Sequence, residues 1–200
     1  MQLENHKILY ITVTVTLALL IASPALQHFL VYPQSEFFTE MWLLGPNQKA
    51  ENYPYNIVQN QHYQIYLGLS NHLGSATYYR VDVKLRNQTM LGPDGFQRTP
   101  SDLPTLYSFN IIVADQQTVQ VPVDFSLTYH QFNDSQINFN QLTINSNTIN
   151  INGYTTSWNN TNHDYYEKLV FELYLYNSTT NSFQYHERFV DLRLNMTAPA

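Results

Sequence analysis

Residues 118–129 read TVQVPVDFSLTY, and this stretch decides the fold class. Apolar side chains recur at every second position, and mostly polar side chains fill the positions between them. Successive side chains of an extended strand point to opposite faces, so this segment has one apolar and one polar face. The alternation therefore predicts a β-strand. Pro122 lies on the polar face and cannot donate a main-chain hydrogen bond, which predicts a sheet edge or a bulge at that position.

The same period of two recurs along most of the chain from Glu36 onward. Residues 76–86 (ATYYRVDVKLR) and 167–176 (EKLVFELYLY) show it clearly, and residues 177–182 supply a turn before the last strand, which predicts a C-terminal hairpin. About seven short strands without an amphipathic helix are typical of an immunoglobulin-like β-sandwich. The alternation in residues 76–86 also predicts a set of solvent-facing side chains: Arg80, Asp82, Lys84 and Arg86.

Residues 133–162 interrupt this rhythm, because ten of these thirty residues are asparagine. We interpret the segment as an insertion between two sandwich strands that fold without it. Apolar residues are spaced regularly through it, so it is expected to form a short extra hairpin.

The N-terminal residues 1–32 hold a run of 19 residues without a charge, Ile8 to Leu26. A helix of this length is typical of a membrane span. Lys7 precedes the run and the next cation is Lys49, so the positive-inside rule keeps the N-terminus in the cytoplasm. We therefore expect a single-pass cell-membrane protein whose residues 33–200 form an exported domain. The alternative is a cleaved signal peptide with a weak cleavage signal at residues 23–25.

Sites for N-linked glycans agree with an exported domain, although a chain rich in Asn, Ser and Thr produces some by chance. The candidates share the pattern Asn-x-Ser/Thr and fall in expected turns, polar stretches or the C-terminal tail: Asn87, Asn133, Asn159, Asn177 and Asn195.

The composition excludes several classes of function. Charged residues make up 12% of the chain and the formal net charge is −6, so no basic stripe is present to bind nucleic acid. There are no cysteines, which excludes disulfides and thiolate metal sites. The seven histidines lack the spacing of a local ligand set. We expect no metal, no cofactor and no small-molecule ligand.

Residues with the chemistry for catalysis are few and scattered. No nucleophile elbow, phosphate loop or His-Glu-x-x-His sequence is present. Glu172 and Glu187 could meet across the last hairpin, but a solvated face is the expected setting for both. We therefore predict that the chain is not an enzyme. Replacing His72, Glu172 or Glu187 is expected to have only local effects on stability.

Residues 36–54 (EFFTEMWLLGPNQKAENYP) carry aromatic residues where a chain would leave a bilayer, then a turn and an extended Tyr53-Pro54 pair. The ordered motifs Phe38-Thr39-Glu40, Leu44-Gly45-Pro46, Lys49-Ala50-Glu51 with Tyr53-Pro54, and Asn71-His72 resemble an archaeal membrane-protein family, domain of unknown function 1616. Residues 170–197 are similar to the last hairpin of that family. The resemblance implies an exported C-terminal domain and no particular activity.

These observations favour a non-catalytic module that acts by protein–protein contact in a cell-envelope or membrane complex. Apolar strips and strand edges are the features left to hold a partner. The candidate contact residues are Phe38, Trp42 and Tyr53. The alternative is a carbohydrate-binding domain, which would need Tyr78, Tyr154 and Trp158 in one exposed row. An enzyme accessory domain is a third reading and would need a deep pocket with converging carboxylates or histidines.

Overall fold

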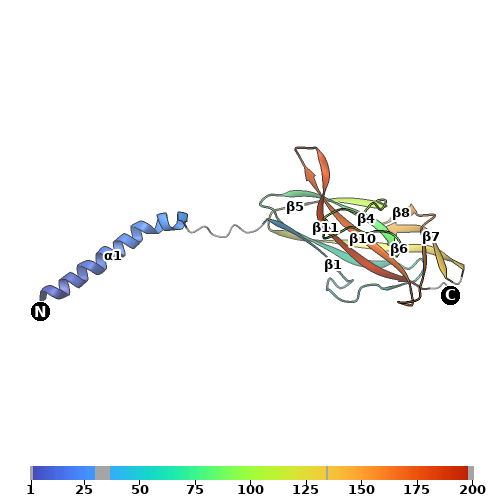
Figure 1. Ribbon diagram of the computed structural model, residues 1–200, viewed down its shortest axis with the longest axis horizontal. Helices are drawn as coiled ribbons and strands as arrows, with labels where there is room; N and C mark the ends of the chain where they lie inside the picture. The colour runs from blue at the N-terminus through green and yellow to red at the C-terminus, as the bar shows by residue number, and fades with distance from the viewer. Residues whose placement is uncertain (1, 30–36, 134, 198–200) are drawn as a thin grey trace. The chain divides into compact units, whose positions relative to one another are not determined.

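The structure is a computed structural model that describes residues 2–29, 37–133 and 135–197. The chain divides into two compact units, residues 1–36 and 37–200, and each is described by itself. The first unit contains helix α1 (Gln2–Phe29), drawn in blue in Figure 1. Within α1, the hydroxyls of Thr12, Thr14 and Thr16 donate hydrogen bonds to carbonyl oxygens four residues earlier, at 2.9, 2.7 and 2.8 Å. These bonds satisfy the threonines in a helix, although their alternation with valine is strand-like.

No helix in the described part of the chain is both long and apolar enough to cross a membrane. The expected span lies in residues 1–32, of which residues 1 and 30–32 are outside the described ranges. The single-pass topology stays a prediction of the sequence.

The second unit is built of β-strands (Figure 1). Their bounds are β1 (Phe38–Leu44), β2 (Asn56–Ile57), β3 (Tyr63–His72), β4 (Thr77–Asn87), β5 (Tyr107–Val113), β6 (Gln117–Asn133), β7 (Gln136–Ile144), β8 (Asn147–Asn150), β9 (Thr155–Asn159), β10 (Asp164–Asn177) and β11 (Ser182–Met196). The predicted C-terminal hairpin is confirmed, because β10 and β11 pair as antiparallel strands with Asn177 opposite Ser182.

The strands form one sheet in the order β1-β3-β6-β7-β9-β10-β11-β2. Strand β4 attaches to β10 and carries β5, while β8 attaches to β7. All pairs are antiparallel except the short β11–β2 pair. Strand β9 pairs with both β7 and β10, so the sheet curls and both of its halves supply side chains to one core.

The predicted inward faces are confirmed. Tyr79, Val81, Val83 and Leu85 of β4 are each 0% exposed. The odd-numbered residues of β6 from Val123 to Tyr129 are at most 1% exposed. Burial of this apolar surface is the main term that stabilises the domain. The all-β class of residues 37–197 therefore follows from the alternation.

The prediction for Pro122 is also confirmed. Pro122 lies opposite Tyr66 of β3, whereas β7 pairs with β6 only from Phe125 onward. The first half of β6 thus has one neighbouring strand, and Pro122 occupies an edge where a missing N–H costs no ladder bond.

The interpretation of residues 133–162 as a separable insertion is wrong. Strand β7 pairs with β6, and β9 bridges β7 to β10, so this segment closes the curled sheet. Its regularly spaced apolar side chains belong to the core and are at most 2% exposed: Ile137, Phe139, Leu142, Ile144 and Ile151. Asparagine is frequent in this segment because the outer face of these strands is polar. The many asparagines made the alternation of apolar and polar residues hard to recognise in the sequence.

The predicted solvent face of β4 is partly wrong. Asp82 and Lys84 are 4% and 3% exposed, because Ser101 and the polypeptide around it cover this face. The Lys84 ammonium lies 2.7 Å from the Glu172 carboxylate of β10 and donates to Ser101 O at 3.0 Å. Glu172 is therefore part of a buried ion pair and not of a solvated face.

Candidate functional site

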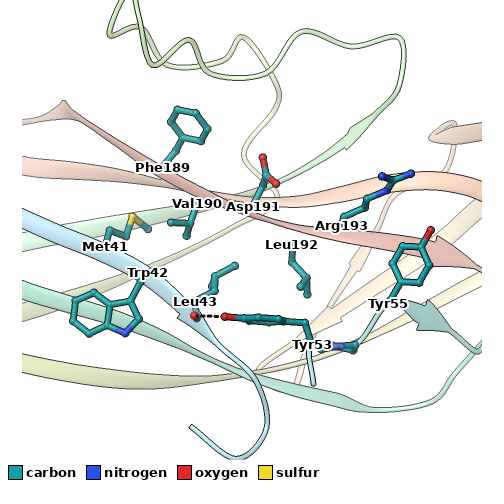
Figure 2. Close-up of a pocket in the computed structure, with 11 residues that line it drawn as sticks. Met41, Trp42, Leu43, Tyr53, Tyr55, Phe189, Val190, Asp191, Leu192 and Arg193 are labelled. Atoms are coloured by element: carbon teal, nitrogen blue, oxygen red, sulfur yellow. Dashed lines mark hydrogen bonds between the residues drawn. The ribbon is translucent and has the colours of Figure 1, made fainter. Parts of the chain in front are cut away.

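A hollow of about 650 Å³ lies between β1 and β11 and is called the β1–β11 groove here. It is lined by Met41, Trp42 and Leu43 from β1, by residues 189–193 from β11, and by residues 53–55 of the connecting loop. Figure 2 shows the two strands on either side, with the Tyr53 ring lying across one end of the groove. Met41, Leu43 and Val190 pack against the hydrophobic core, so the groove opens on the margin of that core.

On the side of β1 away from β3, main-chain N–H and C=O groups point toward this groove. Asn71 O of β3 accepts a hydrogen bond from Gln116 N at 2.7 Å, so the main-chain groups of Asn71 point away from β1. Its register partner Thr39 therefore occupies a non-hydrogen-bonded position, and the main-chain groups of Thr39 point away from β3. Main-chain direction alternates along a strand, so Met41 and Leu43 also direct their N–H and C=O groups toward the groove.

Side chains occupy two of these three carbonyl oxygens. Arg188 Nε donates to Thr39 O at 3.2 Å, and the Tyr53 hydroxyl donates to Leu43 O at 2.8 Å (Figure 2). Among the described residues, the N–H and C=O of Met41 have no hydrogen-bond partner. The middle of β1 is thus an open strand edge.

The opposite wall, β11, also has an open edge. Asn195 N donates to Tyr55 O at 2.7 Å and Thr197 N donates to Ile57 O at 3.0 Å, so odd-numbered residues direct their main chain away from β10. Strand β2 covers this edge only at residues 195–197. The same alternation leaves three residues with main-chain groups toward the groove and without a backbone partner in the described chain: Phe189, Asp191 and Arg193.

Local sequence holds β1 and its loop in place. A Cβ atom on Gly68 of β3 would lie 2.1 Å from the Trp42 ring, so glycine is needed for the indole to lie flat on the sheet. A Cβ atom on Gly45 would lie 2.0 Å from Glu51 O, and Gly45 N donates to Lys49 O at 2.7 Å. The turn predicted after Leu44 is therefore a close loop, and it leads from β1 to residues 53–55 of the groove.

The motif Phe38-Thr39 lies directly opposite the motif Asn71-His72. The ring of Phe38 stacks on His72 at 4.5 Å between centroids. Asn71 Oδ1 accepts a hydrogen bond from Leu73 N at 3.1 Å, so the Asn71 side chain caps the turn after β3. His72 does not cap this turn, because its contacts are to Phe38 and to Ser70 Oγ at 2.8 Å. The two motifs are thus one structural unit.

A buried polar network connects this unit to β11. The Thr39 hydroxyl lies 2.9 Å from the Tyr79 hydroxyl and 2.8 Å from His186 Nε2, and Tyr79 donates to Asn71 Oδ1 at 3.1 Å. Burial and then the charge of Arg188 lower the pKa of His186, so its imidazole stays neutral at neutral pH. The network holds β1 against β11 at the end of the groove nearest Phe38.

The structure brings Trp42 and Tyr53 to the β1–β11 groove, and Phe38 to an adjoining hollow on β1. Sequence reasoning missed the β11 wall, Phe189 to Arg193, because its position depends on pairings between strands far apart in the chain. Alternation of apolar residues at Val190, Leu192 and Leu194 predicts a strand here, but it does not show that the strand has an open edge.

Histidines and carboxylates do not form a reactive cluster among the described residues, where no group of three or more such side chains could hold a metal ion. Glu187 does not join Glu172. Its carboxylate pairs with exposed Arg98 at 3.3 Å, at a bulge in β11 where Glu187 has a φ of 55°.

Four of the five sequon asparagines are the last residue of a strand, and the fifth, Asn195, lies inside β11, against expectation. Asn87 ends β4, is 9% exposed, and donates to Thr155 O at 2.8 Å. Asn195 lies in β11 and donates to Asn56 Oδ1 at 2.8 Å. Both side-chain nitrogens thus donate hydrogen bonds within the folded domain.

The other three sequons lie at strand ends and turns. Asn159 and Asn177 accept turn hydrogen bonds from Thr161 N and Thr179 N, each at 2.9 Å. Asn133 is exposed at the end of β6, and the next residue, 134, is outside the described ranges. These three positions agree with the expected polar turns.

The aromatic residues proposed for carbohydrate binding do not meet. Tyr78 packs with Tyr176 near the end of β10, whereas Trp158 packs with Tyr165 at its start. These two β10 residues are eleven positions apart, which is roughly 36 Å along a strand. Tyr154 is half-buried against the core. The three residues thus do not form one row.

Comparison with known proteins identifies a family but no activity. The model of the family described as "Domain of unknown function (DUF1616)" matches residues 33–139. No curated protein matches the chain. The match ends within β7, although β10 and β11 complete the same sheet.

Similar solved structures include a β-glucosidase from Listeria innocua, in complex with glucose (7% identity) and with gluconolactone (6% identity). Each likeness has a TM-score of 0.35 and covers 84% of this chain but 17% of the β-glucosidase chain. The chain thus spans about a sixth of that protein, and a likeness this low carries no functional argument. Because the family model covers more than half of its residues, the chain belongs to the DUF1616 family.

Proposed function

We propose that this protein is a non-catalytic contact module that binds a protein partner through the β1–β11 groove. The observation that carries the proposal is the pair of open strand edges, at Met41 and at residues 189–193, on two sides of one apolar hollow. Unpaired main-chain groups beside an apolar surface are the two features that strand addition uses for affinity and specificity.

The setting of this module is proposed from the sequence. The uncharged run from Ile8 to Leu26 supports attachment to the cell membrane with residues 33–200 outside the cytoplasm. The curled antiparallel sheet supports an immunoglobulin-like sandwich as its architecture. A component of a cell-envelope or membrane complex would combine these features.

Truncation of Trp42 tests the contact surface. Tryptophan residues at the centre of an interface often contribute 2 kcal/mol or more to binding, so Trp42→Ala should reduce the partner recovered with the detergent-solubilised chain by at least about tenfold. Trp158→Ala is the matched control. Trp158 is 37% exposed, belongs to β9 where that strand pairs with the start of β10, and does not line the groove. Recovery should be measured for variants with intact cooperative unfolding. Equal recovery with both variants would contradict the proposal.

A further inference from the structure

The β1–β11 groove is one end of a longer trough. A second hollow of about 670 Å³ shares Met41 and Trp42 with the groove, and a third of about 290 Å³ shares Phe38, Thr39 and Arg188 with the second. The three hollows follow the seven residues of β1, a length of roughly 23 Å. Such a length matches an extended segment of about seven residues.

Strand β2 shows how the trough-side edge of β11 accepts a strand. Two residues, Asn56 and Ile57, already pair with β11 in parallel at Asn195 and Met196. The edge continues without a partner strand from there to Phe189 within the described chain. An added strand would extend the same line of pairing into the trough, and its alternate side chains would face Met41, Leu43 and Val190.

Charge identifies one position of the added strand. Lys168 lies 2.8 Å from Asp191, and Arg193 lies 2.5 Å from buried Asp164, so these charges are compensated. Arg188 is exposed and has no carboxylate within ion-pair distance among the described residues. Its guanidinium donates instead to the main-chain oxygens of Thr39 and Glu187. In a chain with net charge −6, this leaves one uncompensated cation on the trough.

We propose that the trough binds an extended peptide strand of a partner protein, with alternating apolar residues and one acidic residue beside Arg188. This occupant adds to the free edge of β11 and rests on the proposed contact function. Main-chain bonds to Phe189, Asp191 and Arg193 supply affinity, and the acidic residue fixes the register.

The test uses a displayed library of random twelve-residue peptides selected on the detergent-solubilised full chain. The expected sequences alternate apolar and polar residues and carry Asp or Glu at one fixed position. Changing that acid to Lys should weaken binding about tenfold, and Arg188→Glu should reverse this preference. Methylating alternate main-chain nitrogens of the peptide should abolish binding. Lys49→Glu is the matched control and should leave binding unchanged, because Lys49 is exposed and lines none of the three hollows.

Four results would overturn the strand proposal. They are no enrichment, enriched sequences without alternation, insensitivity to main-chain methylation, or a concentration-dependent dimer of the chain that blocks the peptides. If any of these occurs while Trp42→Ala still releases the cellular partner, the contact function stands and the strand occupant fails.

Discussion

Glu172→Ala is expected to lower the free energy of unfolding by about 3–5 kcal/mol, because it removes one partner of a buried ion pair. Glu172 is 0% exposed, and its carboxylate accepts hydrogen bonds from Lys84 Nζ at 2.7 Å and Ser101 N at 3.0 Å, with a further bond from Ser101 Oγ. Without it, the Lys84 ammonium would stay buried without a counter-charge. Urea unfolding of the full chain measures the change. This expectation corrects the sequence-based one, which assigned Glu172 a local effect only.

Two further variants distinguish the loss of the ion pair from a nonspecific loss of stability. Glu187→Gln should change stability by less than about 0.5 kcal/mol, because the Glu187–Arg98 pair is exposed. Replacing both partners, Lys84→Met with Glu172→Leu, should restore most of the loss, since apolar pairs often substitute for buried ion pairs. A Glu172→Ala variant as stable as Glu187→Gln would refute the buried pair.

Glu167→Gln is expected to make the domain more stable than the natural chain at neutral pH. Glu167 lies on the inner face of β10, is 1% exposed, and neither carboxylate oxygen has a hydrogen-bond partner among the described residues. Burial raises the pKa of this carboxyl well above its ordinary value. Tyr154 lies close enough that the Glu167 charge adds to burial in raising the pKa of its hydroxyl.

The sign of the pH dependence follows from this raised pKa. The folded chain keeps a proton that the unfolded chain releases, so the contribution is fully present below the unfolded pKa and is lost as pH rises toward the folded pKa. Within that window stability should fall by about 1.4 kcal/mol per pH unit. Urea unfolding as a function of pH should show this fall in the natural chain and in Glu40→Gln, and not in Glu167→Gln. Identical slopes for all three proteins would show that Glu167 ionises freely.

The sequence was sufficient to predict β4, β6, β10, the C-terminal hairpin and their inward faces, because alternation is a local property. It also contained a clue to Glu167, which has the same parity as the buried Leu169, Phe171 and Leu173. Lys84 was misplaced because residues near Ser101 cover its face, and no local pattern shows that cover.

The candidate site was predicted only on its β1 side. Trp42 and Tyr53 were expected to contact a partner, and the structure places both at the groove, with Gly68 making room for the indole. The β11 wall forms because β1 and most of β11 have no neighbouring strand on the side that faces the groove. Strand order is set by long-range pairing, and alternation alone does not determine it.

Amide hydrogen exchange of the full chain, alone and in the complex purified from cells, tests the β1–β11 groove most directly. Binding should slow exchange at Met41, Asp191 and Arg193, whose amides face the groove without a partner in the described chain. Exchange in β8, residues 147–150, should stay unchanged, because this strand lies at a different edge of the sheet. Slowed exchange in β8 with no change at Met41, Asp191 and Arg193 would contradict the account.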